Sequence, residues 1–160
     1  MEHICKTCYE NPGSHSFTIL SSIKSLELDK NIHIFYTKIS TAKKYNDSDG
    51  ILNHYTNYLN YINPDMWIWI VDFDGFEMKH YLEIKTTKRL ANLIKSYGKL
   101  HQIVIINSNS FVKLLINITK PILSELKHKL FIFTKDDKEK LKNHLCNLNC
   151  DNNIITFMTS

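Results

Sequence analysis

Three short apolar runs constrain the fold of this 160-residue chain more than any other feature of its sequence. They span residues 66–72, 102–107 and 130–133, and segments with helical character separate them. Continuous apolar runs of this length are typical of strands that are covered on both faces, as in parallel sheets with crossover helices. The pattern predicts an α/β fold with a mostly parallel β-sheet flanked by helices. In open sheets of this kind, ligands bind beside the carboxyl ends of the strands.

The remaining segments complete one domain. The alternating segment 31–39 predicts a further strand, and 16–20 predicts a short edge strand. Helical spacing and stop signals predict helices over 51–62, 87–97 and 136–148, and the last strand is expected at 154–157. The chain contains no internal repeat and no linker. We therefore expect an irregular N-terminal segment with the edge strand over residues 1–30, and a single domain over 31–160.

The segment 111–126 has very little polar surface. Apolar side chains surround it on nearly every side, and Pro121 is expected to break the helix because proline removes a hydrogen-bond donor and clashes with the preceding turn. A helix that is apolar nearly all round must be covered on both sides, by protein or by lipid.

Charge and hydropathy exclude several classes of function. The net charge of +4 comes almost entirely from lysine, since Arg89 is the only arginine, and nucleic-acid readers usually need arginine forks. We expect no nucleic-acid partner, and a solvated lysine surface with weak attraction to anionic membranes. No apolar run reaches the roughly 20 residues that span a bilayer, and the N-terminus lacks the apolar core of a secretory signal. A soluble, cytoplasmic protein is expected.

Four cysteines lie in two pairs near the ends of the chain, namely Cys5, Cys8, Cys146 and Cys150. Two spaced pairs raise the hypothesis of a four-thiolate zinc site, in which His3 and His15 could replace one pair. Ordinary reduced cysteines are the alternative, and no metal or cofactor is assigned. Four further histidines lack the spacing of a helical metal site and are interpreted as surface or half-buried residues: His54, His80, His101 and His128.

The residues after the first apolar run also resemble the start of a haloacid-dehalogenase-type phosphatase. In that family, the carboxylates that correspond to Asp72 and Asp74 would act as nucleophile and general acid beside magnesium. Ser108 and Asp136–Asp137 follow later strands, and a lysine such as Lys113, Lys120 or Lys129 could bind phosphate. Phe76 stands where that family has threonine or valine. Carboxylates that cap turns explain the same residues without catalysis.

An ordered set of features resembles the CRAL-TRIO domain, the lipid-binding module of cytosolic lipid-transfer proteins. A strand ends at Asp72 with Gly75 close behind, and the strand 103–107 ends in asparagine. The other matching segments are Tyr97-Gly-Lys-Leu100, Ser110-Phe-Val-Lys-Leu-Leu115, Lys120-Pro-Ile-Leu-Ser124 and Lys129-Leu-Phe-Ile-Phe133. The order and spacing of these elements carry the resemblance, which covers about two-thirds of the sequence.

The resemblance implies a non-catalytic module that holds a phospholipid or fatty acid in an apolar pocket between the sheet and residues 111–126. The candidate lining residues are Trp69, Val71, Phe73, Ile105, Phe111, Leu115 and Ile118. Any one of these side chains is explained equally well by core packing. For the set, the excess of apolar side chains on 111–126 favours a pocket.

The chain also departs from the CRAL-TRIO pattern. Few residues precede Asn31 where many members have a helical subdomain, and the usual Leu-Pro-x-x-aromatic-Gly-Gly ending does not follow the last expected strand. In this the chain is similar to the compact variants of Rho GTPase-activating proteins and BCH-type scaffolds. A scaffold with a closed core that binds a small GTPase or a second copy of itself is therefore the alternative function.

Overall fold

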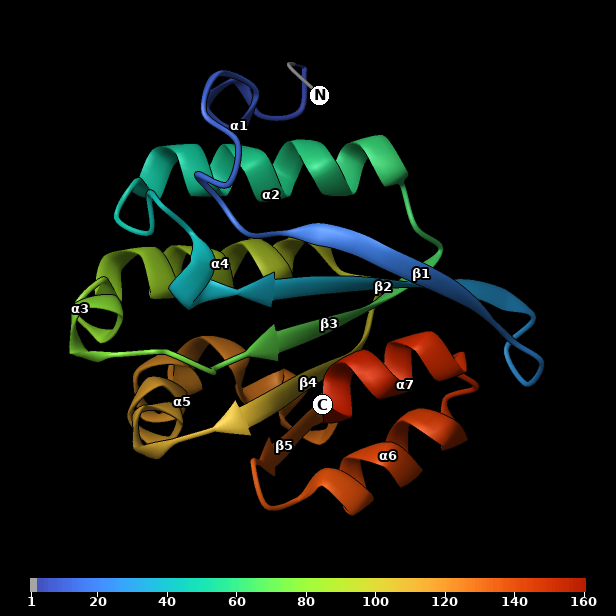
Figure 1. The fold of residues 1–160 in the computed structure, drawn as a ribbon. Helices are drawn as coiled ribbons and strands as arrows, with labels where there is room; N and C mark the ends of the chain where they lie inside the picture. The colour runs from blue at the N-terminus through green and yellow to red at the C-terminus, as the bar shows by residue number, and fades with distance from the viewer. Residues whose placement is uncertain (1–2) are drawn as a thin grey trace.

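The fold is built on one five-stranded sheet whose strands follow the order of the chain. The computed structural model describes residues 3–160 (Figure 1). Strand β1 (Thr18–Ser25) is an antiparallel edge strand, and it pairs with β2 (Lys30–Lys38). The parallel strands β3 (Met66–Asp72), β4 (Leu100–Ser108) and β5 (Leu130–Thr134) follow in that order. The predicted α/β class with a mostly parallel sheet is confirmed, and the edge strand is longer than expected.

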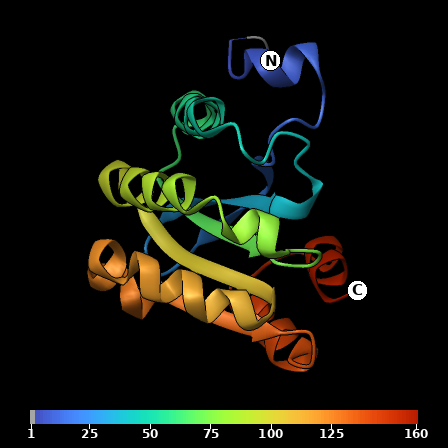
Figure 2. The same cartoon turned by 90° about the vertical axis from the view of Figure 1, so that its left-hand side faces the viewer.

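Helices cover both faces of the sheet. The crossover helices α2 (Ser48–Ile62), α4 (Ile84–Tyr97) and α5 (Ser110–Leu123) pack on one face, while α6 (Lys138–Asn147) and α7 (Asn152–Thr159) pack on the other (Figures 1 and 2). The short elements are α1 (Lys6–Glu10), η1 (Ile39–Thr41), α3 (Met78–Tyr81) and η2 (Ser124–Lys129). No helix within residues 3–160 combines the length and apolar character needed to cross a bilayer.

Successive strand residues point to opposite faces, so the sheet separates two apolar cores. In β3, Trp67 and Val71 belong to the core beneath α2, α4 and α5, whereas Ile68 and Ile70 belong to the core beneath α6 and α7. Because both faces are covered, the central strands have no polar face. This is why they appear in the sequence as continuous apolar runs.

Local capping explains several helix boundaries. The Asp47 side chain accepts a hydrogen bond from the Gly50 amide and so caps the start of α2. Helix α2 ends at Asn63 in the left-handed conformation (φ 51°), followed by Pro64. Helix α4 ends at Gly98 with φ 75°, a conformation that glycine adopts at little cost.

Helix α5 differs from the expectation in two ways. The helix continues through Pro121 to Leu123 and is followed by the 3-10 helix η2, so proline does not break it. The Pro121 side chain is exposed, near the end of the helix. Only one side of α5 is buried, through Val112, Leu115 and Thr119, while Leu114 is 45% exposed. The expectation that this helix must be covered on both sides was wrong.

The segment 154–157 is helical, so the predicted last strand was also wrong. The Asp151 side chain accepts a hydrogen bond from the Ile154 amide and caps α7. Ile154, Ile155 and Met158 then point into the core beneath α6 and α7 at helical spacing. Capping and packing therefore decide the conformation of this short apolar run, and β5 remains the edge of the sheet.

Candidate functional site

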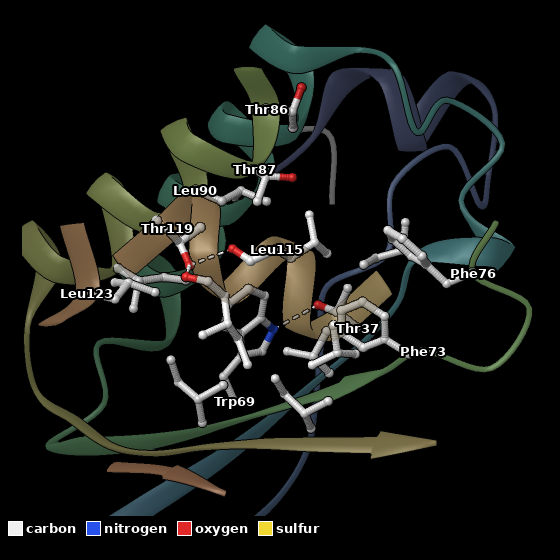
Figure 3. A pocket seen from close by; sticks show the side chains of 18 of the residues that line it. Thr37, Trp69, Phe73, Phe76, Thr86, Thr87, Leu90, Leu115, Thr119 and Leu123 are labelled. Atoms are coloured by element: carbon white, nitrogen blue, oxygen red, sulfur yellow. Dashed lines mark hydrogen bonds between the residues drawn. The ribbon is translucent and has the colours of Figure 1, made fainter. Parts of the chain in front are cut away.

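A cavity of about 570 Å³ lies between the sheet and helices α4 and α5. Its floor is formed by side chains of β2, β3 and β4 that point to this face, and its walls come from α4 and α5 (Figure 3). Figure 3 shows Trp69 on the floor, with Leu90 of α4 and Leu115 and Leu123 of α5 around it. A largely apolar enclosure of this size is typical of small-ligand sites.

The structure brings together five of the seven predicted lining residues. They are Trp69, Val71, Phe73, Ile105 and Leu115. Phe111 lies elsewhere, packed with its ring centroid 5.7 Å from those of Phe76 and Tyr81. Ile118 is half-buried outside the cavity lining. The face of α5 that lines the cavity instead carries Val112, Leu115, Ile116, Asn117, Thr119, Lys120 and Leu123.

Helix α4 forms a wall that the sequence did not predict. Its lining residues are Thr86, Thr87, Leu90, Ala91 and Ile94. Several of these side chains are small, and Thr119 of α5 is another small residue on the opposite wall. Small side chains on the buried face of a helix leave unfilled volume when the backbone is held away from the sheet by larger neighbours. The amphipathic pattern of this segment was visible, but its alanine and threonine residues gave no direct signal of a cavity.

A chain of hydrogen bonds satisfies the polar groups on the cavity floor. The Trp69 Nε1 group donates to Thr37 Oγ1 at 2.9 Å, and Thr37 Oγ1 lies 2.9 Å from the Tyr55 hydroxyl. Tyr55 in turn donates to the Ser16 carbonyl oxygen at 3.2 Å. Burial raises the pKa of Tyr55 far above its usual value, so this hydroxyl stays neutral. The floor therefore carries no charge.

The solvent-exposed lining residues all come from one side of the cavity. They are Asn117 and Lys120 of α5, Ser124 and Lys127 of η2, and Ile132 of β5. The remaining lining residues are buried, as Phe76 and His80 are, or half-buried, as Tyr45 and Glu83 are. We therefore place the mouth of the cavity beside Lys120 and Lys127, two exposed cations.

Asp72, the first carboxylate that resembled a phosphatase site, follows the cavity-lining Val71 in β3 and so points to the opposite face of the sheet. Asp72 is buried, and its two oxygens accept hydrogen bonds from the Tyr36 hydroxyl, the Asn107 side chain (2.9 Å) and the Asp74 amide (2.9 Å). Burial and the contact with Asp72 raise the pKa of Tyr36 far above its usual value. The arrangement of Asp72 is that of a residue that caps a turn and links neighbouring strands.

Two lysines hold the side chain of Asp74. Its carboxylate lies 2.9 Å from Lys135 Nζ and 3.3 Å from Lys38 Nζ, and these cations lower the pKa of Asp74. The later carboxylates Asp136 and Asp137 lie beyond β5, where Asp137 accepts hydrogen bonds from the amide and hydroxyl of Thr134. These interactions also belong to turns.

The two cysteine pairs do not meet. Cys146 and Cys150 lie at the end of α6, on the face opposite α2, and Cys5 and Cys8 lie at α1 (Figure 1). Cys5 and Cys8 instead lie beside His15 and His54. His54 and His80 are buried, contrary to the interpretation of these histidines as surface or half-buried residues. Burial lowers the pKa of each and favours the neutral imidazole.

The combination of a mostly parallel sheet and an apolar cavity beneath two crossover helices defines an α/β domain with an internal pocket. A sequence profile of the CRAL/TRIO domain matches residues 50–151, which is most of the chain. The protein belongs to the CRAL/TRIO domain family, a family of modules that bind lipophilic ligands. Among curated proteins, none matches the chain.

Proposed function

We propose that this protein is a non-catalytic lipid-binding module that holds one acyl chain in the cavity beneath α4 and α5. The observation that carries this proposal is the cavity itself, with its uncharged floor and largely apolar walls. Family membership supports a lipophilic ligand in general terms. A fatty acid, or one acyl chain of a phospholipid, is the ligand class that fits this space.

The volume of the cavity supports a single chain. A methylene group occupies about as much volume as a water molecule in the liquid, roughly 30 Å³, so the cavity of about 570 Å³ has room for about 19 such groups. Two full-length acyl chains would not fit. Each buried methylene contributes about 0.8 kcal/mol before the cost of immobilising the chain is subtracted.

The mouth favours an anionic headgroup. Lys120 and Lys127 are exposed there, and the exposed residues of the cavity lining include no carboxylate. A carboxylate or phosphate at this position would leave the acyl chain in the apolar interior and keep its own charge in water. The same two lysines would also attract the protein to an anionic membrane surface from which a lipid could be taken.

Two competing functions have less support. A scaffold with a closed core, which would bind a small GTPase or a second copy of the chain, would not require an internal cavity. A phosphatase would require a carboxylate that a phosphate group can reach, whereas Asp72 is only 6% exposed and accepts three hydrogen bonds from neighbouring protein groups. These observations support a binding module without catalytic activity.

The proposal is tested by lipid extraction followed by a binding series. Mass spectrometry of an organic extract is expected to find a lipid that co-purifies with the protein. After lipid removal, fatty acids of increasing length are titrated while tryptophan fluorescence is recorded, because the indole of Trp69, one of the two tryptophans, lines the cavity. Affinity is expected to rise about fourfold per added methylene and to level off near 18–20 carbons. Absence of binding by every chain length would refute the proposal.

Charge-reversal variants test the position of the headgroup. The pair Lys120→Glu and Lys127→Glu is expected to weaken binding of an anionic lipid several-fold at low salt, because exposed charges interact modestly and are screened. Lys142→Glu, at an exposed position of α6 on the other face of the sheet, is the matched control. An equal loss in the control would show that only the net charge matters, and the mouth would have to be placed elsewhere.

A further inference from the structure

Four potential metal ligands converge where the N-terminal segment meets α2. They are Cys5 and Cys8 of the α1 region, His15 in the segment before β1, and His54 of α2. One ligand atom from each residue lies within 4.8 Å of all the others. Cys5, His15 and His54 are buried, and Cys8 is partly buried.

Two sulfur–nitrogen distances in the cluster lie near the edge length of a tetrahedral metal site. Cys5 Sγ lies 3.2 Å from His15 Nδ1, and Cys8 Sγ lies 3.6 Å from His54 Nδ1. With Zn–S bonds of about 2.3 Å and Zn–N bonds of about 2.0–2.1 Å, the sulfur–nitrogen edges of a tetrahedron measure about 3.6 Å. Both histidines direct Nδ1 towards the sulfur atoms, so the same ring nitrogen of each faces the centre of the cluster.

The second nitrogen of each imidazole already has a partner that would orient the ring. His15 Nε2 lies 2.9 Å from the Asp47 carboxylate, and His54 Nε2 lies 2.9 Å from the Phe17 carbonyl oxygen. Histidines that bind metal usually donate this second N–H to a carboxylate or a backbone carbonyl, which fixes the tautomer that leaves the other nitrogen free for the metal. Both histidines here have this arrangement.

The sulfur atoms receive hydrogen bonds from the backbone. The Cys8 amide donates to Cys5 Sγ at 3.3 Å, and the His15 amide donates to Cys8 Sγ at 3.3 Å. Two sulfurs and two imidazoles in a closed set suit Zn²⁺, and no ligand position is left open for a substrate.

We propose that Cys5, Cys8, His15 and His54 bind one structural Zn²⁺ that fastens the N-terminal segment to α2. A helix of five residues such as α1 is unstable by itself, and a metal bond to His54 would hold it in place. The site would also fix Ser16 and Tyr55, the neighbours of His15 and His54, which both line the lipid cavity. Three of the four ligands precede the segment that matches the CRAL/TRIO profile, and His54 lies within it.

The test measures metal content in the intact chain. Elemental analysis of protein purified without chelators is expected to find about one zinc per chain, and Cys8→Ser and His54→Ala are each expected to lose most of it. Cys146→Ser, at an exposed cysteine outside the cluster, is the matched control and should keep the full amount. Zinc that is retained in both ligand variants, or absent from the wild-type protein, would overturn the proposal.

Spectroscopy tests the metal site in the wild-type protein, so the result does not depend on whether a variant folds. Cobalt that replaces the zinc is expected to show the d–d and thiolate charge-transfer bands of a tetrahedral site with two sulfurs and two nitrogens. X-ray absorption at the zinc edge should give the same ligand set. An octahedral or oxygen-rich spectrum, or a disulfide between Cys5 and Cys8 in the metal-free protein as purified, would count against the proposal. These measurements do not depend on whether a lipid is bound.

Discussion

The two faces of the sheet bury alternate residues of the same strands, yet one face is filled and the other is hollow. On the filled face, α6 and α7 contribute large aliphatic side chains such as Leu141, Leu145 and Ile154. On the hollow face, α4 and α5 contribute Thr86, Ala91 and Thr119 among their inward residues. The volume of the helix side chains, rather than the sheet, decides where the cavity forms.

Because of this difference, the filled face is expected to contribute mainly to stability and the hollow face to ligand binding. Close packing supplies dispersion contacts on every side of a core residue, whereas an empty cavity leaves its lining without partner atoms. The filled face is therefore expected to carry more of the folding free energy per side chain. A ligand on the hollow face would supply the missing contacts and stabilise the folded state by mass action.

The largest expected effect is on the free energy of unfolding, and it is measured by comparing two leucines on opposite faces of the sheet. Leu145 is fully buried (0% exposed) on the filled face, and Leu115 (8% exposed) lines the cavity. Leu145→Ala is expected to lower the free energy of unfolding of the lipid-free protein by about 3–4 kcal/mol, because it opens a new cavity in a close-packed region. Leu115→Ala only enlarges an existing space, so a loss of about 2 kcal/mol is expected.

Urea unfolding of the two variants, with the slope of the transition compared as well as its midpoint, measures this difference. Leu114→Ala, at the exposed position next to Leu115, is the control for the loss of a leucine from α5. Equal losses for Leu145→Ala and Leu115→Ala would mean that both faces are packed alike, and the contrast between them would disappear.

The second prediction concerns a variant whose larger side chain would fill the cavity on the hollow face. Ala91→Phe places a ring in the cavity and is expected to reduce fatty-acid affinity by at least about tenfold, since the ring displaces several methylenes of about 0.8 kcal/mol each. The free energy of unfolding without lipid should change by less than about 1.5 kcal/mol, because the ring occupies empty space. Titration of fatty acid and urea unfolding give the two values.

Asn92→Phe is the matched control, because Asn92 is the next residue of α4 and is exposed. It should bind fatty acid like the wild-type protein. If Ala91→Phe bound lipid normally but destabilised the fold by several kcal/mol, the ring would have been forced into packed protein, and the cavity would not be the binding site.

The sequence predicted the sheet well because its signals are local. Continuous apolar runs marked β3, β4 and β5, and alternation marked β2. Burial on two faces could be derived from pattern alone for β3 and β4, whereas the apolar run of β5 forms a partly exposed edge strand. The prediction of a strand at 154–157 was wrong because it relied on the same kind of local signal. Four apolar residues do not distinguish a strand from a turn of helix, and the Asp151 cap together with packing against α6 decided the outcome.

The candidate sites were harder to predict because they depend on distance in space. Strand alternation placed Trp69, Val71 and Ile105 on the cavity face, but the rotation of α5 about its axis excluded Phe111 and Ile118. The cluster at His54 shows the same limit. Cys8 and His54 are 46 residues apart in the sequence, and only the packing of α1 against α2 brings them together.

The smallest expected effect concerns a histidine on the filled face. His144 of α6 lies against the rings of Phe131 and Phe133, and its Nε2 donates to the Gln102 side-chain oxygen at 2.7 Å. Burial lowers the pKa of His144 below its usual value of 6.5, so the unfolded chain binds a proton more readily than the folded chain. The stability linked to this group is complete above about pH 6.5 and is lost as the pH falls through the lower folded-state pKa.

Thermal unfolding between about pH 7.5 and 5 measures this contribution. His144→Gln keeps a hydrogen-bonding side chain but cannot gain a proton, so its Tm should fall less on acidification than that of the wild-type protein, by roughly a few degrees at most. His128→Gln, at an exposed position of η2, controls for the loss of a histidine. An unchanged pH dependence in His144→Gln would show that water reaches the His144 ring in the folded protein. The filled face would then be less closely packed around α6 than the structure indicates.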